Sequence, residues 1–97
     1  MIQLIQEDYG ELRYEIWNGE PLLHATVQHW SPSLFKEMRE LLEDIKVYFK
    51  EEGFTRMYVA GKSGNVKVQK FWGMFGFHKA IEEDGVVIYA QELTDGS

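Results

Sequence analysis

The chain contains no cysteine, and this absence excludes several kinds of site at once. A disulfide framework, a cysteine nucleophile and a thiolate metal site all require residues that are missing. No apolar run approaches the roughly 20 residues that a membrane span needs. The segment Met1–Glu7 also lacks the basic start and apolar core of a signal peptide. We therefore expect a cytoplasmic protein that does not enter a membrane.

Acidic residues dominate the chain but are absent from one long stretch of it. The chain has 10 Lys and Arg against 16 Asp and Glu, and its formal net charge of −6 argues against general nucleic-acid binding. Between Gly53 and Ile81 there is no Asp or Glu, and the basic residues there are Arg56, Lys62, Lys67, Lys70 and Lys79. These cations form either a solvated surface, which is the simpler interpretation, or contacts to a cofactor phosphate or an acidic partner.

Apolar and aromatic residues are plentiful. Hydrophobic residues make up 44% of the 97 positions, and they include three Trp, five Tyr and six Phe. This is enough to offset chain entropy in one folded core, and the chain is too short for two. We expect a single domain over residues 1–93 and a loose tail over residues 94–97.

The first thirty residues have the patterns of strands joined by tight turns. A short strand is predicted over residues 2–6, with a turn at 8–10. Leu12, Tyr14 and Ile16 then alternate with less apolar neighbours, which is typical of a half-buried strand. Asn18-Gly19 is a strong hairpin signal, because both residues tolerate a positive φ, and a returning strand is predicted over residues 22–29.

A long amphipathic helix is predicted next. Ser31 or Ser33 can cap its start, and Pro32 suits its first turn. One wide apolar face at helical spacing consists of Leu34, Phe35, Met38, Leu41, Leu42, Ile45, Tyr48 and Phe49. Gly53 is suited to a left-handed C-terminal cap, and we expect Phe54 to fold back on the last residue of this face.

The second half predicts a strand, a short helix and a hairpin. The strand spans residues 55–60, and a loop follows over residues 61–64. Asn65 can cap a helix that ends at Gly76, with Val68, Phe71, Trp72 and Phe75 on one side. The final strands are predicted over residues 77–81 and 86–93, turning at residues 82–85.

These elements predict a mixed α/β (α+β) domain with two helices, in the order β-β-β-α-β-α-β-β. A strand, a helix and a strand in succession form a right-handed crossover. The strands over residues 22–29 and 55–60 should therefore be parallel.

The segment from Asn65 to Phe77 resembles a hallmark of GNAT-type N-acetyltransferases. In that family an Asn precedes a helix that ends in an aromatic pair, a short spacer and a Leu-Gly-Phe-like corner. The matching residues here are Asn65, Phe71-Trp72 and Phe75-Gly76-Phe77. By element order the resemblance covers residues 22–93, without the early helices of the family. It implies a GNAT-like mixed sheet.

The resemblance also implies a place for acetyl-CoA, between the strands over residues 22–29 and 55–60 and at the start of the long helix. Members of the family surround the pyrophosphate with a glycine-containing loop. The corresponding stretch here, His29–Lys36, has no glycine, and Pro32 removes a backbone donor. The cofactor-binding residues that the resemblance implies are Gln28, His29, Trp30, Ser31, Ser33, Lys36, Asn65 and Trp72.

No catalytic residue can be assigned from the sequence. Many family members have a Tyr in the second helix that protonates the departing thiolate, but Phe71-Trp72 stands there instead. Tyr48 and Tyr58 are nearby aromatics that are more simply packed residues.

The histidines and the glycine loop offer little alternative chemistry. His24 and His29 are five apart on a predicted strand and face opposite sides, so they predict no metal site. His29 is either a general base beside the cofactor loop or a surface histidine. Residues 61–65 lack the full pattern of a phosphate-binding loop.

The two departures from the family lead to two interpretations. The first is a GNAT-like interaction protein without acetyltransferase chemistry and without a cofactor. Such a protein acts on a protein partner, and its short acidic chain suggests a bacteriophage or mobile element. A separate possibility is a purely structural homo-oligomer, such as a homodimer, in which sheet edges and exposed aromatics pair between copies. The alternative is an acetyl-CoA-dependent N-acetyltransferase with an atypical pyrophosphate loop. The sequence leaves open whether the chain is an enzyme, and it names no substrate.

Overall fold

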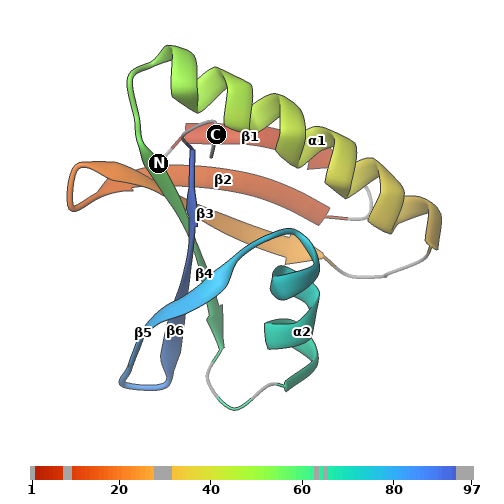
Figure 1. Ribbon diagram of the computed structural model, residues 1–97. Coiled ribbons are helices and arrows are strands. Elements are labelled where there is room, and N and C mark those ends of the chain that lie inside the picture. Colours follow the sequence, from red (N-terminus) through yellow and green to blue (C-terminus); the bar gives the residue numbers. More distant parts are fainter. Residues whose placement is uncertain (1, 8–9, 28–31, 63, 65, 94–97) are drawn as a thin grey trace.

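The computed structural model describes residues 2–7, 10–27, 32–62, 64 and 66–93 of the chain. Its elements are β1 (Ile2–Glu7), β2 (Gly10–Trp17), β3 (Glu20–Val27), α1 (Pro32–Glu51), β4 (Arg56–Lys62), α2 (Val66–Met74), β5 (His78–Glu83) and β6 (Val86–Glu92). This order confirms the predicted mixed α/β class and its succession of strands and helices (Figure 1). Of the expected turn at residues 8–10, Gly10 instead begins β2, and residues 8–9 lie outside the described residues, as does the expected tail at 94–97.

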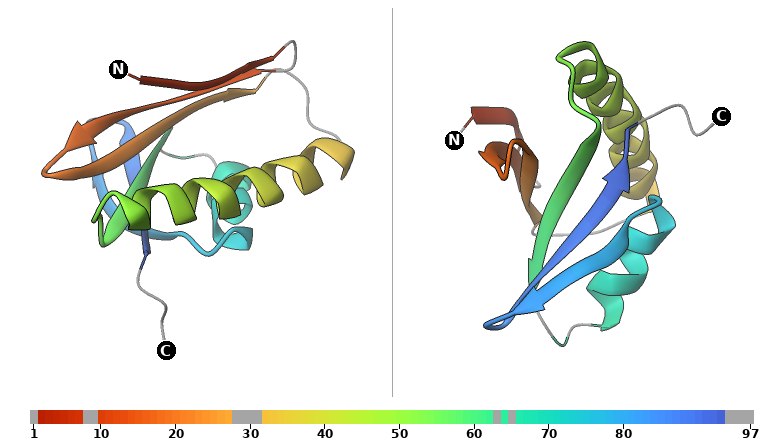
Figure 2. Two further views of the ribbon diagram at one scale, coloured as in Figure 1. Left: turned by 90° about the horizontal axis from the view of Figure 1, so that it is seen from above. Right: turned by 60° about the vertical axis from the view of Figure 1, so that its left-hand side comes forward.

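The strands form one six-stranded sheet in the order β1-β2-β3-β4-β6-β5. All neighbours are antiparallel except β3 and β4, which are parallel, as the crossover through α1 predicts. Both helices lie on the same side of the sheet (Figure 2). They also touch each other, since Phe35 of α1 meets Phe71 of α2 edge to face with ring centroids 6.0 Å apart. Phe35 also stacks on Phe75, the residue after α2, at 4.9 Å. Neither of the two helices in the described part of the chain covers the opposite face of the sheet, and we call it the helix-free face.

The main core lies between the sheet and the two helices. It includes Leu12 and Tyr14 of β2, and the buried residues of α1 are Leu34, Met38, Leu42, Ile45 and Phe49, all from the predicted apolar face. Tyr48, at the edge of that face, is 43% exposed. The expectation for Ile16 is wrong, because its side chain is 56% exposed. Ile16 lies next to the β2–β3 turn, and the end of this hairpin extends past the end of α1 (Figure 2).

The C-terminus of α1 ends as predicted. Gly53 has a φ of 93°, and its N–H donates to the Lys50 carbonyl at 3.0 Å. The N–H of Phe54 donates to the Phe49 carbonyl at 3.1 Å. Their rings meet edge to face, with centroids 5.9 Å apart. These two hydrogen bonds and the apolar contact make a Schellman motif, which satisfies the last carbonyls of the helix.

The C-terminus of α2 repeats this arrangement with different residues. Gly76 has a φ of 90°, and its N–H donates to the Gly73 carbonyl at 3.1 Å. The N–H of Phe77 donates to the Trp72 carbonyl at 3.1 Å, and the two rings pack with centroids 5.5 Å apart. The aromatic-glycine-aromatic pattern therefore ends the helix and sends the chain into β5.

Several predicted boundaries are wrong by one or two residues. Ser33 is the second residue of α1 rather than its cap, and Gly61 and Lys62 extend β4 rather than forming a loop. β3 begins at Glu20 instead of residue 22, and the predicted end of this strand at residues 28–29 lies outside the described residues. Both hairpins turn on two residues with positive φ, so the flanking strands continue to the turn itself. In the second hairpin these two residues are Asp84 and Gly85, so Glu82 and Glu83 belong to β5 and not to the turn.

No helix in the described part of the chain has the length and the hydropathy needed to cross a bilayer.

Candidate functional site

The pairing of β3 with β4 stops after a short ladder. The paired residues are Leu22 with Tyr58 and Leu23 with Val59. Beyond them, β3 stays paired with β2 as far as Val27, and β4 stays paired with β6 as far as Lys62. The two strands thus separate toward their carboxyl ends (Figure 1). We call this region, from His24 to Val27 and from Ala60 to Lys62, the β3–β4 divergence.

The β3–β4 divergence gives the sheet two inner strand edges. A strand edge presents N–H and C=O groups that can pair with an extended ligand. The residues where the divergence opens are small: Ala25 follows His24 on β3, and Ala60 and Gly61 follow Val59 on β4. An extended chain with amide groups is therefore the kind of ligand that suits this part of the sheet.

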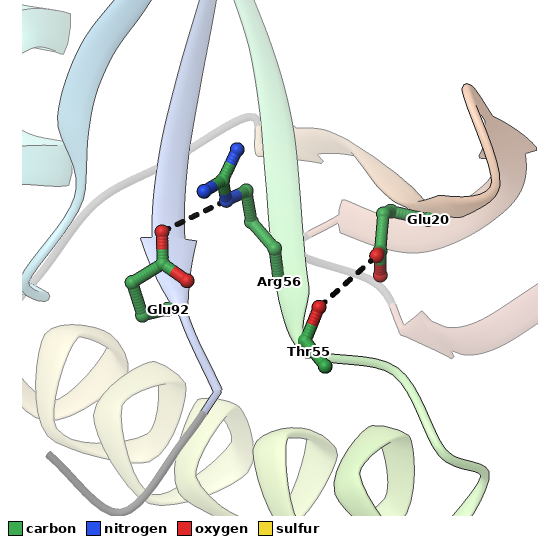
Figure 3. Close-up of polar contacts among 4 residues, drawn as sticks. All are labelled: Glu20, Thr55, Arg56 and Glu92. Atoms are coloured by element: carbon green, nitrogen blue, oxygen red, sulfur yellow. Dashed lines mark hydrogen bonds and ion pairs between the residues drawn. The ribbon is translucent and has the colours of Figure 1, made fainter.

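Polar contacts fasten the other ends of these strands (Figure 3). The hydroxyl of Thr55 donates to Glu20 Oε1 at 3.2 Å, which links the start of β3 to the residue before β4. Arg56 Nε donates to Glu92 Oε1 at 2.8 Å and links β4 to the end of β6. Arg56 also hydrogen-bonds Tyr58, and Tyr58 and then Glu92 raise the pKa of the guanidinium. Side-chain contacts thus hold β3 and β4 in place at their amino ends, whereas the two strands separate at their carboxyl ends.

Both helices begin at the edge of the sheet where β3 and β4 separate. Four residues separate the end of β3 from the start of α1, and three separate the end of β4 from the start of α2. Neither helix has an acidic residue in its first turn. In α1, Ser33 and Lys36 are exposed within the first turn and just beyond it. Helix N-termini attract anions through free N–H groups and the helix dipole, and an acidic first turn would have weakened that attraction.

Only part of the site predicted from the sequence can be placed. Gln28, His29, Trp30, Ser31 and Asn65 lie outside the described residues. The structure places Ser33 and Lys36 together near the start of α1, as the sequence suggested.

Trp72 is separated from this group. Its side chain is 5% exposed and belongs to the main core, with ring contacts to Phe71, Phe75 and Phe77. It packs the core instead of facing a ligand, so we remove it from the candidate site.

The two tyrosines noted in the sequence lie in different places. Tyr48 is on the last turns of α1, where it hydrogen-bonds Tyr14 and raises the pKa of that hydroxyl, with burial adding to the effect. Tyr48 is twelve residues past Lys36, a rise of about 18 Å along a helix. Tyr58 lies on the helix-free face, where its ring meets Trp17 edge to face at 5.0 Å. Only Tyr58 adjoins the β3–β4 divergence.

One pair that sequence reasoning missed also adjoins the divergence. His24 Nε2 lies 3.2 Å from Glu15 Oε1, and both side chains are partly exposed on the helix-free face. The hairpin signal in the sequence was sufficient to predict this pair. A two-residue turn at Asn18-Gly19 pairs Glu15 with Leu22, and His24 is then the diagonal neighbour of Glu15 on the same face. Counting outward from the turn would have brought the two residues together.

No group of three or more His, Asp or Glu suited to a metal ion occurs among the described residues. The candidate site therefore consists of two inner strand edges, two helix N-termini with the Lys36 cation, and the His24–Glu15 pair. This combination suits a ligand that has an extended amide chain and phosphate groups.

The fold is similar to those of several solved acetyltransferases. An acetyltransferase of the GNAT family from Listeria monocytogenes matches with a TM-score of 0.63 at 16% identity, over 87% of this chain and 57% of that chain. The GNAT domain of S. lividans PAT matches with a TM-score of 0.68 at 25% identity, over 87% of this chain and 53% of that chain. For the ribosomal-protein-S18-alanine N-acetyltransferase from Escherichia coli, the TM-score is 0.62 at 18% identity, over 98% of this chain and 69% of that chain.

The likeness is one of structure. No protein-family model matches the sequence, and no curated protein is significantly similar to it. The chain spans little more than half the length of the first two matched structures. Its element order, its parallel β3–β4 pair and these superpositions agree: the chain has the GNAT-type acetyltransferase fold.

Proposed function

We propose that this chain binds an acyl-CoA thioester, with acetyl-CoA as the reference ligand, and transfers the acyl group to an amine. The observation that carries the proposal is the short parallel ladder between β3 and β4, which ends after Leu23 and Val59. An acyl-CoA has an extended arm with two amide groups, and this arm matches the inner strand edges that the β3–β4 divergence offers. Because β3 and β4 each keep their outer partner, the arm can bind without breaking the sheet.

The start of α1 supports binding of the phosphate groups of the same ligand. The loop before α1 lacks the glycines that allow close backbone approach to a pyrophosphate, and Pro32 has no N–H. The remaining attraction comes from the helix dipole, the Ser33 hydroxyl and the Lys36 ammonium group. Lys36 therefore contributes a larger share of phosphate binding here than a residue in a glycine-rich loop would.

Calorimetric titration with acetyl-CoA and with CoA tests the proposal. We expect micromolar dissociation constants for the unaltered protein. The Lys36→Glu variant should bind about tenfold more weakly, which corresponds to about 1.4 kcal/mol. That is close to the value of one hydrogen bond to a charged group.

Lys46→Glu is the matched control, because it makes the same change of net charge ten residues further along α1, about 15 Å away. It should bind within about twofold of the unaltered protein, since Lys46 forms an i,i+3 ion pair with Glu43 and lies far from the start of α1. Absence of binding at millimolar ligand would remove the acyl-CoA proposal. Equal weakening by both variants would assign the effect to net charge and not to a site at the start of α1.

A second candidate function is an interaction protein that uses the scaffold without acyl transfer, and the helix-free face favours it. Apolar side chains cross this face from β2 to β5, and they include Trp17, Leu22, Tyr58, Ile88 and Ile81. Ile81 is 42% exposed, whereas Leu22 and Ile88 are buried at 4% and 9%. Aromatic residues are enriched in protein interfaces, and the exposed part of this stripe is a candidate contact surface for a partner.

The occupant that we commit to for this face is a second copy of the chain. Two pairs of opposite charge lie beside the stripe: Arg13 with Glu11, and Arg56 with Glu92. Two such faces can meet without adding like charges, although each chain carries a net charge of −6. The suggested origin in a bacteriophage or mobile element stays a prediction.

Sedimentation velocity over a range of concentrations separates the two candidates. A concentration-dependent dimer that is lost in Ile81→Glu, and kept in Met74→Glu, would support the second function. Met74 is the control because it is 66% exposed on α2, away from the helix-free face. A monomer at all concentrations would exclude self-association and leave the acyl-CoA proposal unaffected.

A further inference from the structure

The His24–Glu15 pair stands at the point where β3 leaves β4. Leu23 is the last residue of β3 that pairs with β4, and His24 follows it directly. Leu23 and Ala25 face the main core, so the alternation of the strand turns His24 to the helix-free face. The imidazole therefore lies at the rim of the β3–β4 divergence, on the side that neither helix covers.

The side chains of the pair are partly exposed to solvent, and the Glu15 carboxylate orients the His24 imidazole. The side chains of His24 and Glu15 are 30% and 42% exposed, and Nε2 lies 3.2 Å from Oε1 of the carboxylate. A carboxylate only accepts hydrogen bonds, so this contact places the imidazole proton on Nε2. In the neutral imidazole, Nδ1 then has a lone pair that can accept a proton. The arrangement resembles other sites in which a carboxylate orients a histidine base.

We propose that His24 is the general base of the acyl transfer and that Glu15 is its positioning residue. The inference rests on the proposed binding of an acyl-CoA in the β3–β4 divergence. An amine that approaches from the helix-free face meets the thioester beside Nδ1 of His24. This face is not blocked by α1 or α2, whose rings pack against each other on the opposite side.

The step balances as a simple acyl transfer. The amine nitrogen forms a bond to the carbonyl carbon of the thioester, and its proton passes to Nδ1 of His24. The bond between carbon and sulfur breaks, and the thiolate leaves with the electron pair. The imidazolium then returns its proton to the thiolate. An amide and a thiol result, with no oxidant, reductant or further reactant.

Other charged and titratable groups near His24 come from both neighbouring strands. On β2, Arg13 pairs with His24 in the register, and its Nε lies 3.4 Å from Glu11. On β4, Tyr58 pairs with Leu22 and already hydrogen-bonds Arg56, and Lys62 is the titratable residue at the end of that strand. On these strands, the carboxylate of Glu15 contacts the His24 imidazole.

The first test measures acetyl-CoA binding and thiol release in parallel, with a panel of primary amines as acceptors. His24→Gln should bind acetyl-CoA within about twofold of the unaltered protein but transfer about 10²-fold to 10⁴-fold more slowly. The pH dependence of the rate that a general base imparts should vanish in this variant. His78→Gln is the matched control, because His78 is an exposed histidine on β5, at the far edge of the sheet.

The second test does not depend on turnover. Nitrogen NMR of the His24 ring should show a proton on Nε2 and none on Nδ1 in the unaltered protein. Glu15→Ala should give a mixture of both tautomers and slower transfer with unchanged binding. Glu15→Gln keeps an oxygen acceptor and should restore much of both readouts.

The outcomes separate the two proposals. If acetyl-CoA does not bind, the proposed function fails, and the role of His24 fails with it. If acetyl-CoA binds and His24→Gln keeps the rate and the pH profile, only the role of His24 is overturned. Binding without any acceleration of thiol release by the unaltered protein would also overturn it. An Nδ1 proton in the unaltered protein would exclude Glu15 as the positioning residue.

Discussion

The two helix-ending glycines provide a controlled test of how the fold is packed. Gly53 and Gly76 hold the same position in two Schellman motifs, with φ values of 93° and 90°. They differ in what a side chain would meet. A Cβ on Gly53 meets nothing within 4 Å, whereas a Cβ on Gly76 meets the side-chain amide of Gln91. The difference between the two alanine variants should therefore report this single contact.

The expected magnitudes follow from the backbone and from that contact. An L-residue in the left-handed region costs about 1–2 kcal/mol. Replacing Gly by Ala also lowers the conformational entropy of the unfolded chain, and this offsets about 0.4–1 kcal/mol of the cost. Gly53→Ala should thus lower the free energy of unfolding by about 1 kcal/mol. Gly76→Ala should cost about 1 kcal/mol more, because the Gln91 side chain must leave its rotamer.

Urea denaturation followed by circular dichroism measures both variants, and Gln91→Ala completes a double-mutant cycle. In the Gln91→Ala background, the cost of Gly76→Ala should fall to that of Gly53→Ala, since the amide is gone. Equal losses for the two glycine variants in the natural background would refute the packing of β6 against the end of α2. The same packing would be refuted if Gly76→Ala lowered the free energy of unfolding equally with and without the Gln91 side chain.

Two further predictions concern the core and the pH dependence of stability. Trp72→Ala should lower the free energy of unfolding by about 3–5 kcal/mol, because the side chain is only 5% exposed. Met74→Ala is the control: this position is 66% exposed, so the free energy of unfolding should change by less than about 0.5 kcal/mol. A small loss for Trp72→Ala in urea denaturation would contradict the position of α2. The hydrogen bond to Tyr48, and then burial, raise the pKa of Tyr14 above its ordinary value of 10.0. Between the unfolded and folded pKa values the native state holds the proton that the unfolded state has lost, so stability should be full below about pH 10 and fall above it, by at most about 1.4 kcal/mol per pH unit for this group. Tyr14→Phe should lack this contribution, and its deficit relative to the unaltered protein should shrink as the pH rises; a constant deficit in alkaline denaturation would contradict this.

Local signals in the sequence predicted most of the elements correctly. The periodicity of α1 and the glycines at 53 and 76 depend on residues three to five apart, which interact whatever the rest of the chain does. The same is true of the hairpin at Asn18-Gly19. The errors fell at boundaries, as at Glu82 and Glu83, because a charged residue can equally end a strand or begin a turn. Ile16 is exposed because the end of its hairpin extends past the end of α1. The alternation of apolar residues along β2 does not say how far the helix reaches.

By itself, the amino-acid sequence determined the order of strands and helices, the parallel pairing across α1 and the motif around Phe75-Gly76-Phe77 that pointed to the GNAT-type fold. Only the tertiary structure decided which of the candidate residues share a site. It moved Trp72 into the core, and it showed that β3 and β4 separate after two pairs, where His24 meets Glu15. The physical reason is distance along the chain. Local hydrogen bonds and side-chain periodicity act within a few residues, whereas the separation of two strands depends on the twist and packing of the whole sheet.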